Sequence, residues 1–147
     1  MVSSRLPRRV CGNARSDALE ATPSGRRYSM RIAFLCGFRR GLACFQKLLE
    51  MQADLRCVFV YPEDPHEVPC WPAICNLAKE RGIPCYKTRN VAAPEYQTVW
   101  EEAKPDLALV IGWRSMISNG ILERPPLGVV GIHDSLLPKY RGFAPTN

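Results

Sequence analysis

Long apolar runs are missing from this sequence: none approaches the roughly 20 residues that a membrane-spanning helix needs. The first residues also lack the apolar stretch of about 7–15 residues that marks a secretory signal. No internal repeat is visible. With 46% hydrophobic and 23% charged residues, the 147-residue chain has the composition of one globular domain with its own core. We therefore expect a cytoplasmic protein without a membrane partner.

A strong charge of one sign is also missing from most of the chain. The net charge is +6, but residues 1–29 carry six arginines against Asp17 and Glu20. The remaining residues carry 14 basic and 12 acidic side chains, so the body is close to neutral. This balance gives little support for a surface that binds nucleic acid.

Close cysteine pairs of the CxxC type are absent, and the number of cysteines, seven, is odd. Three lie in strand-like or helical runs and are interpreted as small core residues: Cys36, Cys44 and Cys57. A zinc site needs close sets of Cys or His. Only Cys70 and Cys75, with His66 nearby, come near such a set, and we expect no metal. Free thiols fit a reducing cytoplasm.

Residues 1–29 have no apolar period and are rich in Arg, Ser, Ala and Pro. We interpret them as a disordered leader, or as sequence upstream of a mis-assigned start, with translation beginning at Met30. An organelle transit peptide is the alternative, because Arg and Ser are enriched. Asp17 and Glu20 count against that alternative.

From Met30 onward, strand-like and helix-like segments alternate. Apolar runs predict buried strands at residues 31–36, 55–61, 83–86, 106–111 and 127–132. Helical spacing predicts helices at residues 42–49, 72–81 and 94–103, and weakly at 115–123. The alternation predicts a doubly wound, mostly parallel α/β sheet of the Rossmann-like type. Residues 139–147 carry no further helix, so we expect a domain that is incomplete at its C-terminus.

Two glycine turns follow predicted strands. The first, residues 37–41, is not GxGxxG, so a dinucleotide site is not expected. Its Arg39 and Arg40 either meet an anion at a helix N-terminus or are solvated. In the second turn, Gly112 lets the backbone leave the strand sharply. The apolar residues after Gly112 either contact a flat ligand or cover the core.

His133 stands at the carboxyl end of the last predicted strand, where open α/β sheets place their chemistry. It is a candidate acid–base group, or else a satisfied polar residue of the core edge. The loop that follows contains Pro138, Arg141 and Gly142, which make it rigid, cationic and sharply turned. Such a loop suits a charged or polar ligand, although an ordinary surface loop has the same composition.

Residues 105–145 resemble the signature of the folate-dependent formyltransferases, which include methionyl-tRNA formyltransferase and the amino-sugar N-formyltransferases. The matching positions are Pro105-Asp106, Gly112-Trp113, His133, Ser135-Leu136-Leu137-Pro138, Arg141-Gly142 and Pro145. The strand order from Met30 fits as well. The resemblance implies that residues 30–147 are part of the N-terminal catalytic domain of such an enzyme.

The resemblance implies formyl transfer from 10-formyltetrahydrofolate to a primary amine, either methionyl-tRNA or a nucleotide-linked amino sugar. It makes His133 the catalytic residue. The backbone of Ser115, Met116 and Ile117 would hold the pterin, and Ser135, Leu136, Leu137 and Pro138 would lie against the donor. Arg141 and Gly142 would contact the acceptor.

Two departures from the pattern matter. The family has an asparagine two residues before the histidine, and this chain has Gly131 there. The family's aspartate, which orients the histidine, would fall after Asn147. These departures leave an alternative open: a non-catalytic folate-binding or interaction module derived from the same fold.

Overall fold

The computed structural model describes residues 29–133 and 135–141. The prediction that residues 1–29 form a leader therefore falls almost wholly outside the described residues, as does the predicted role of Gly142.

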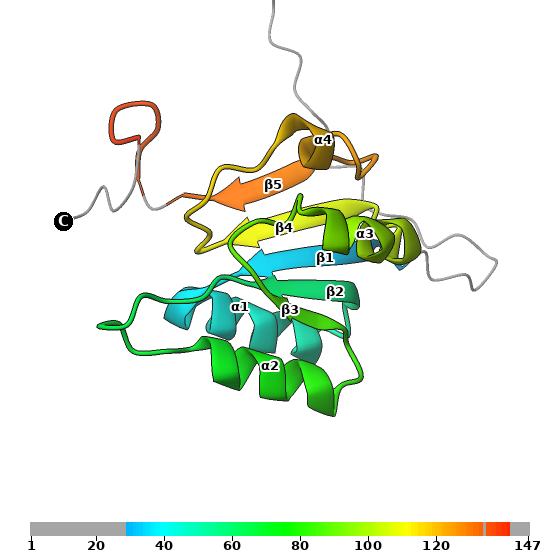
Figure 1. Cartoon of the computed structure of the whole chain (residues 1–147), viewed down its shortest axis with the longest axis horizontal. Coiled ribbons are helices and arrows are strands. Elements are labelled where there is room, and N and C mark those ends of the chain that lie inside the picture. The colour runs from blue at the N-terminus through cyan, green and yellow to red at the C-terminus, as the bar shows by residue number, and fades with distance from the viewer. Residues whose placement is uncertain (1–28, 134, 142–147) are drawn as a thin grey trace, which may run out of the picture.

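A single five-stranded parallel sheet forms the centre of the domain, in the order β3-β2-β1-β4-β5 (Figure 1). The strands are β1 (Arg31–Cys36), β2 (Asp54–Val60), β3 (Cys85–Lys87), β4 (Leu107–Ile111) and β5 (Val129–Ile132). After β1, the chain adds β2 and β3 on one side of that strand and then returns to add β4 and β5 on its other side. This doubly wound order places a topological switch point between β1 and β4 and confirms the predicted fold class.

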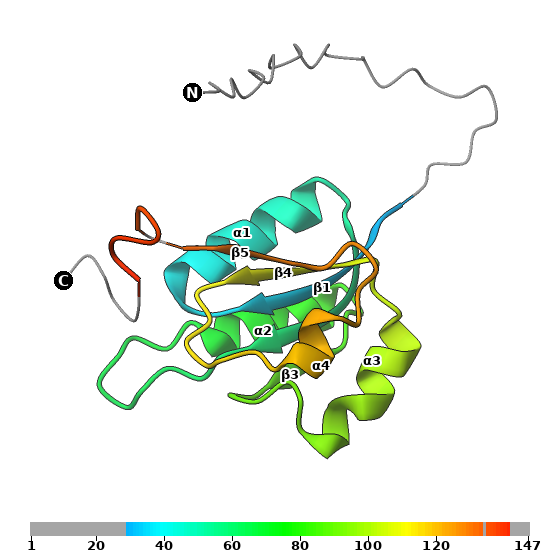
Figure 2. The same ribbon diagram turned by 90° about the horizontal axis from the view of Figure 1, so that it is seen from above.

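Helices cover both faces of the sheet. They are α1 (Phe38–Glu50), α2 (Trp71–Glu80), α3 (Gln97–Ala103) and α4 (Asn119–Leu122), with a 3₁₀ turn, η1 (Pro94–Tyr96), before α3. Figure 2 shows α1 and α3 on opposite sides of the sheet. Alternate residues of β1 serve the two layers: Phe34 packs toward α1 and α2, whereas Leu35 packs toward α3 and α4.

Aromatic side chains fill both layers. Phe34 stacks on Phe45 of α1 at 6.0 Å between ring centroids. On the other face, Phe59 stacks on Trp100 of α3 at 5.3 Å, and the indole N–H of Trp100 donates to the carbonyl of Val91 at 2.9 Å. All four of these rings are buried, so the two faces have separate apolar cores.

Two predicted local features differ from the structure. Residues 37–41 were expected to form a turn, but α1 begins at Phe38. It can start there because the Gly37 N–H bonds to Ile111 and the Gly37 carbonyl accepts the Gly41 N–H at 3.0 Å. The weak helix predicted at 115–123 is only α4, since the Ser118 carbonyl is the first to accept intrahelical bonds.

The amino ends of β1 and β4 are joined by one ion pair. Asp106 accepts the backbone N–H of Arg31 at 2.9 Å and two guanidinium N–H groups at 3.1 and 2.7 Å. These donors lower the pKa of Asp106 to about 2, because they bind the ionised carboxylate more strongly than the protonated one.

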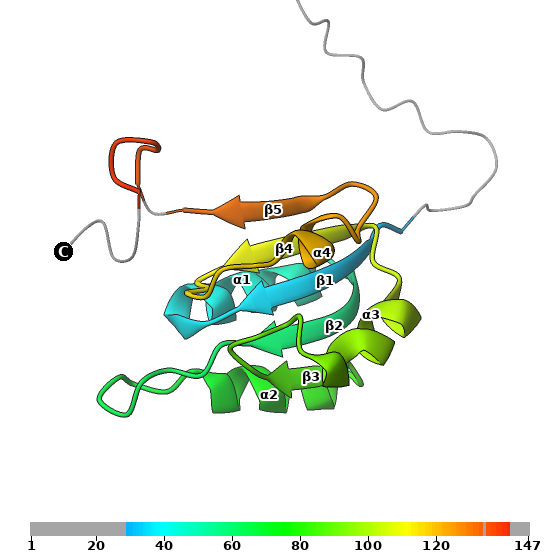
Figure 3. The same ribbon diagram turned by 45° about the horizontal axis from the view of Figure 1, so that its top comes forward.

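The outer edge of the sheet at β5 is thinly covered. Val130 and Ile132 are 49% and 62% exposed, and Figure 3 shows β5 as the last strand on that side. Among the described residues, no helix is both long enough and apolar enough to cross a bilayer.

Candidate functional site

The turns that follow the strands meet at the carboxyl edge of the sheet. Gly37 and Gly112, which directly follow β1 and β4, lie in direct backbone contact there. A Cβ on Gly112 would lie 2.5 Å from the Gly37 carbonyl oxygen, and Gly112 has a φ of +71°. This contact fills the space between the two turns at the switch point.

His133 follows β5 directly and is exposed. Its Nδ1 lies 2.8 Å from the Ser135 hydroxyl oxygen, and that hydroxyl donates to the Tyr140 carbonyl at 2.6 Å. The hydroxyl has a single hydrogen, and its hydrogen bond to the Tyr140 carbonyl uses it. In the neutral ring, Nδ1 therefore carries the hydrogen and donates to Ser135, which leaves the basic lone pair on Nε2. Ser135 thus orients the candidate acid–base group.

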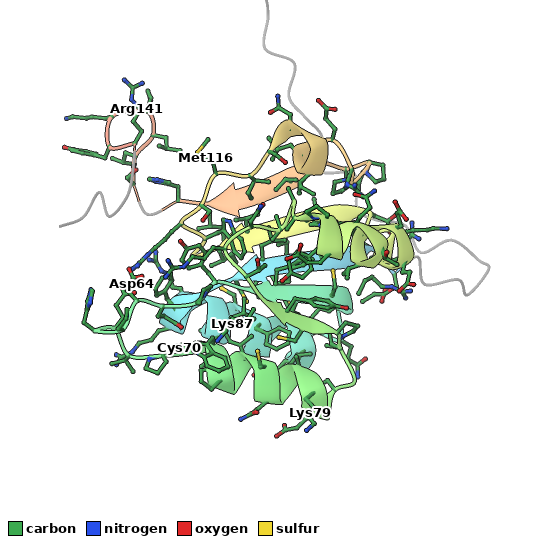
Figure 4. The ribbon with its side chains drawn as sticks, viewed as in Figure 1. Asp64, Cys70, Lys79, Lys87, Met116 and Arg141 are labelled. Atoms are coloured by element: carbon green, nitrogen blue, oxygen red, sulfur yellow. The ribbon has the colours of Figure 1, made fainter. Side chains whose placement is uncertain are left out.

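The loop after His133 projects beyond the sheet. Leu136 and Leu137 are 79% and 57% exposed, and Pro138 and Arg141 are exposed as well. Figure 4 shows Arg141 pointing away from the sheet. The apolar side chains of this loop are thus available to a ligand, but the described residues do not enclose one there.

The turn after β4 contains the three residues predicted to hold the folate donor, and their side chains have different surroundings. Met116 is 96% exposed and points outward (Figure 4), whereas Ile117 packs against the core on the α3 side. The Ser115 hydroxyl reaches the Tyr61 hydroxyl at 3.4 Å. The ring of Tyr61 meets Trp113 edge-on at 5.2 Å. Within the described part of the chain, the buried indole N–H of Trp113 has no hydrogen-bond acceptor.

A charged network at this edge was not foreseen from the sequence. Arg114 binds Glu67 through two N–H groups at 2.6 and 3.0 Å, and it lies 3.6 Å from Asp64. Asp64 in turn accepts a hydrogen bond from Arg89 at 2.7 Å. The guanidinium of Arg114 also lies over the Phe38 ring, 4.0 Å from its centroid. One arginine therefore links the start of α1 to the loops after β2 and β4.

The two hydrogen bonds from Arg114 also favour the ionised form of Glu67. They lower the pKa of Glu67, and the Asp64 backbone N–H, which donates to the same carboxylate at 3.0 Å, lowers it further. The sequence offered only a weak signal for this pair: an arginine beside a glycine turn and an acidic, proline-bounded loop. Their separation of 47 residues gives no local pattern that would match them.

The predicted groups fall into two sets with different hydrogen-bond partners. Ser115 bonds to Tyr61, whereas Ser135 bonds to His133 and Tyr140. A hollow of about 330 Å³ lies near the amino end of β2 and is lined by Leu55, Arg56, Cys57, Gly82, Pro84, Tyr86, Val99, Glu102 and Ala103. No predicted site residue lines it.

A metal centre is not formed by the described residues, in which no three Cys, His, Asp or Glu side chains converge. The Cys70 thiol faces the carbonyl of Val68 at 3.8 Å, whereas Cys75 faces Cys85. Cys70 and Cys75 therefore contact different groups and do not point at one common site.

Comparison with known proteins gives three similarities. A family model described as formyl transferase matches residues 30–147. The methionyl-tRNA formyltransferase of Geotalea daltonii is 31% identical over 121 residues, which cover 80% of this chain and 39% of that protein. The structure of phosphoribosylglycinamide formyltransferase from Streptococcus pneumoniae TIGR4 is 18% identical, with a TM-score of 0.52, over 77% of this chain and 61% of that one. The last similarity concerns the fold alone. The chain spans less than two thirds of the length of either relative.

Proposed function

Because this chain belongs to the formyl transferase family, we propose that it takes part in transferring a formyl group from 10-formyltetrahydrofolate to a primary amine. The family uses this folate as its formyl donor. The observation that carries the proposal is the orientation of His133 at the end of β5, held through Nδ1 by Ser135.

The chemistry follows from that orientation. The acceptor amine attacks the formyl carbon, and the carbonyl oxygen gains negative charge as a tetrahedral intermediate forms. Nε2 of His133 takes the proton that the attacking nitrogen must lose, and the resulting imidazolium stabilises the oxyanion. Collapse of the intermediate releases tetrahydrofolate, whose nitrogen recovers a proton, and leaves the acceptor formylated.

We place the donor against the two turns that flank β4 and β5. Exposed apolar side chains at Met116, Leu136 and Leu137 suit a flat, half-apolar ring system. The indole N–H of Trp113 lies in the same turn as Ser115 and lacks an acceptor among the described residues, so a small shift there would offer it to a ligand. Pro138 continues this surface, and the cations Lys139 and Arg141 follow it in the same loop.

The acceptor is either methionyl-tRNA or a nucleotide-linked amino sugar. The name of the Geotalea relative supports the first. The near-neutral charge of residues 30–147 and the acidic loop at 63–67 support the second. We also propose a cytoplasmic setting, which the half-buried and buried free thiols support.

The test uses the full-length protein with a donor that carries an isotopically labelled formyl group. We expect label to pass to one of the two acceptors and donor binding to be measurable by calorimetry. With a tRNA acceptor, affinity should fall steeply with salt; with a sugar nucleotide, it should fall little. Failure to bind any folate would contradict the proposal.

A second candidate function, folate binding without turnover, is favoured by Gly131. This residue offers no side-chain donor where the family has an asparagine. Folate binding with no transfer to either acceptor would select this candidate, and label transfer would exclude it.

A further inference from the structure

Two half-buried thiols lie in contact on the face of the sheet opposite α3. The sulfur of Cys75, on α2, is 3.1 Å from the sulfur of Cys85, the first residue of β3. They are ten residues apart in sequence, and their elements pack directly on each other. The site proposed above uses neither residue.

The other described cysteines have different surroundings. Cys36 and Cys57 are buried, and burial raises the pKa of each thiol, that of Cys57 to about 12. Cys70 is buried at the start of α2 and directs its thiol at a backbone carbonyl. An oxidant must reach a thiol from solvent, and Cys36, Cys57 and Cys70 are all buried, so these groups are poorly placed for oxidation.

We propose that Cys75 and Cys85 form a dithiol site that a hydroperoxide converts reversibly into a disulfide. In the first step, the Cys75 sulfur attacks the O–O bond of the hydroperoxide and becomes a sulfenic acid, while the peroxide is reduced to an alcohol or water. In the second step, the Cys85 sulfur displaces the hydroxyl from Cys75, which leaves as water. Two thiols lose two electrons and two hydrogens in total, and the peroxide accepts both electrons.

The contact assigns the two roles. Burial raises the pKa of Cys85, and its contact with Cys75 raises it further, so the Cys85 sulfur is the slower of the pair to attack an oxidant. Attack on the oxidant therefore falls to Cys75, and Cys85 is the resolving thiol.

The Cys75–Cys85 disulfide would link the short edge strand β3 covalently to α2. β3 has three residues and pairs only with β2 among the described strands. Lys87 lies on the same face of β3 as Cys85, and its ammonium already sits 3.9 Å from the centroid of the Trp71 ring on α2 (Figure 4). The disulfide would be a second, covalent link between α2 and β3.

The test treats the reduced 147-residue chain with excess hydrogen peroxide, alkylates the remaining thiols and digests the protein with trypsin without reductant. The peptide of residues 82–87 contains Cys85 as its sole cysteine. We expect it joined to the peptide of residues 57–79 through Cys75, with two hydrogens lost from the intact mass and recovered on adding dithiothreitol.

Variants make the assignment specific. Cys75→Ser and Cys85→Ser should each abolish the linked peptide, and Cys44→Ser, which changes a half-buried thiol on α1, should keep it. The decisive measurement is the peptide linkage in the chain without substitutions. A variant that fails to fold therefore does not affect the result. Recovery of the 82–87 peptide alkylated at Cys85 after full oxidation, or linked to a cysteine other than Cys75, would overturn the proposal.

Discussion

Gly37 and Gly112 approach each other so closely that neither position can hold a side chain. A Cβ on Gly37 would lie 2.7 Å from the Gly112 carbonyl oxygen, and one on Gly112 would lie 2.5 Å from the Gly37 carbonyl oxygen. The two turns that flank the switch point are therefore packed as backbone on backbone.

The first prediction concerns this contact. Gly112→Ala should lower the free energy of unfolding by about 2–4 kcal/mol, because it adds a clash to the strain of a positive φ. Gly82→Ala is the matched control: its φ is +67°, but the space around it is open, so we expect a loss of about 1 kcal/mol. Chemical denaturation measures both. Equal losses at the two positions would contradict the clash.

The second prediction concerns pH. Asp106 has a pKa of about 2 in the folded chain and 3.8 as its ordinary value. Between these values the unfolded chain binds more protons, so stability rises with pH across this window and is lost as pH falls toward 2. Asp106→Asn should flatten this part of the stability profile and leave its slope above pH 5 unchanged. An unchanged slope between pH 4 and 2 would disprove the role of the pair.

The third prediction rests on the proposed function. Arg114 and Glu67 hold the turn that leads into Ser115, so Arg114→Ala should weaken donor affinity on the order of tenfold. Arg114→Lys should not restore it, because an ammonium cannot make the two-pronged contact. Glu67→Gln added to Arg114→Ala should have little further effect. Lys47→Ala, which breaks an exposed ion pair on α1, should leave the affinity unchanged.

The fourth prediction concerns His133 in the full-length protein. His133→Ala should reduce formyl transfer by about 10²–10⁴-fold with little change in donor affinity. Ser135→Ala should have a smaller effect on rate and should alter its pH profile, because the ring loses its Nδ1 partner. A pH profile unchanged by Ser135→Ala would remove the orienting role of the serine.

The fifth prediction concerns Gly131. A side chain there would meet nothing nearer than 3.9 Å, and it would lie on the same face of β5 as His133. Gly131→Asn should therefore be tolerated and should raise the transfer rate on the order of tenfold, since one oxyanion donor contributes about 10²–10³-fold when well placed. Gly131→Ala is the control and should leave the rate as it was. If the asparagine variant folds and the rate does not rise, another group already serves the oxyanion.

The sheet could be predicted because its strands carry continuous apolar runs. The sequence predicts buried strands at residues 31–36 and 106–111, and the observed strands β1 and β4 pair in parallel within the sheet. Boundaries were harder where local signals compete: Gly37 resembles the start of a turn, yet the neighbouring β4 supplies a carbonyl to its N–H and lets α1 begin at once. That partner is distant in sequence, so no local pattern reveals it.

The same limit applies to the candidate site. His133 could be placed at a strand end from periodicity alone, and the structure puts it there. The hydrogen bonds that orient it and the pairing of Arg114 with Glu67 depend on side-chain geometry and on loops that meet only in the fold. At Ile117 the sequence left both a ligand contact and the core open for the side chain, and it packs against the core on the α3 side. The expected contact between its backbone and the pterin stays a prediction.

The position of β1 between β2 and β4 determines when each of its edges is protected as the chain is made. β1 can pair with β2 as soon as Asp54–Val60 has been synthesised, but its other edge stays open until Leu107–Ile111 follows. The first half, from β1 to β3, can therefore assemble as a unit while an apolar strand edge remains unpaired. Attachment of β4 closes that edge, and β5, which carries His133 at its end, can join only afterwards.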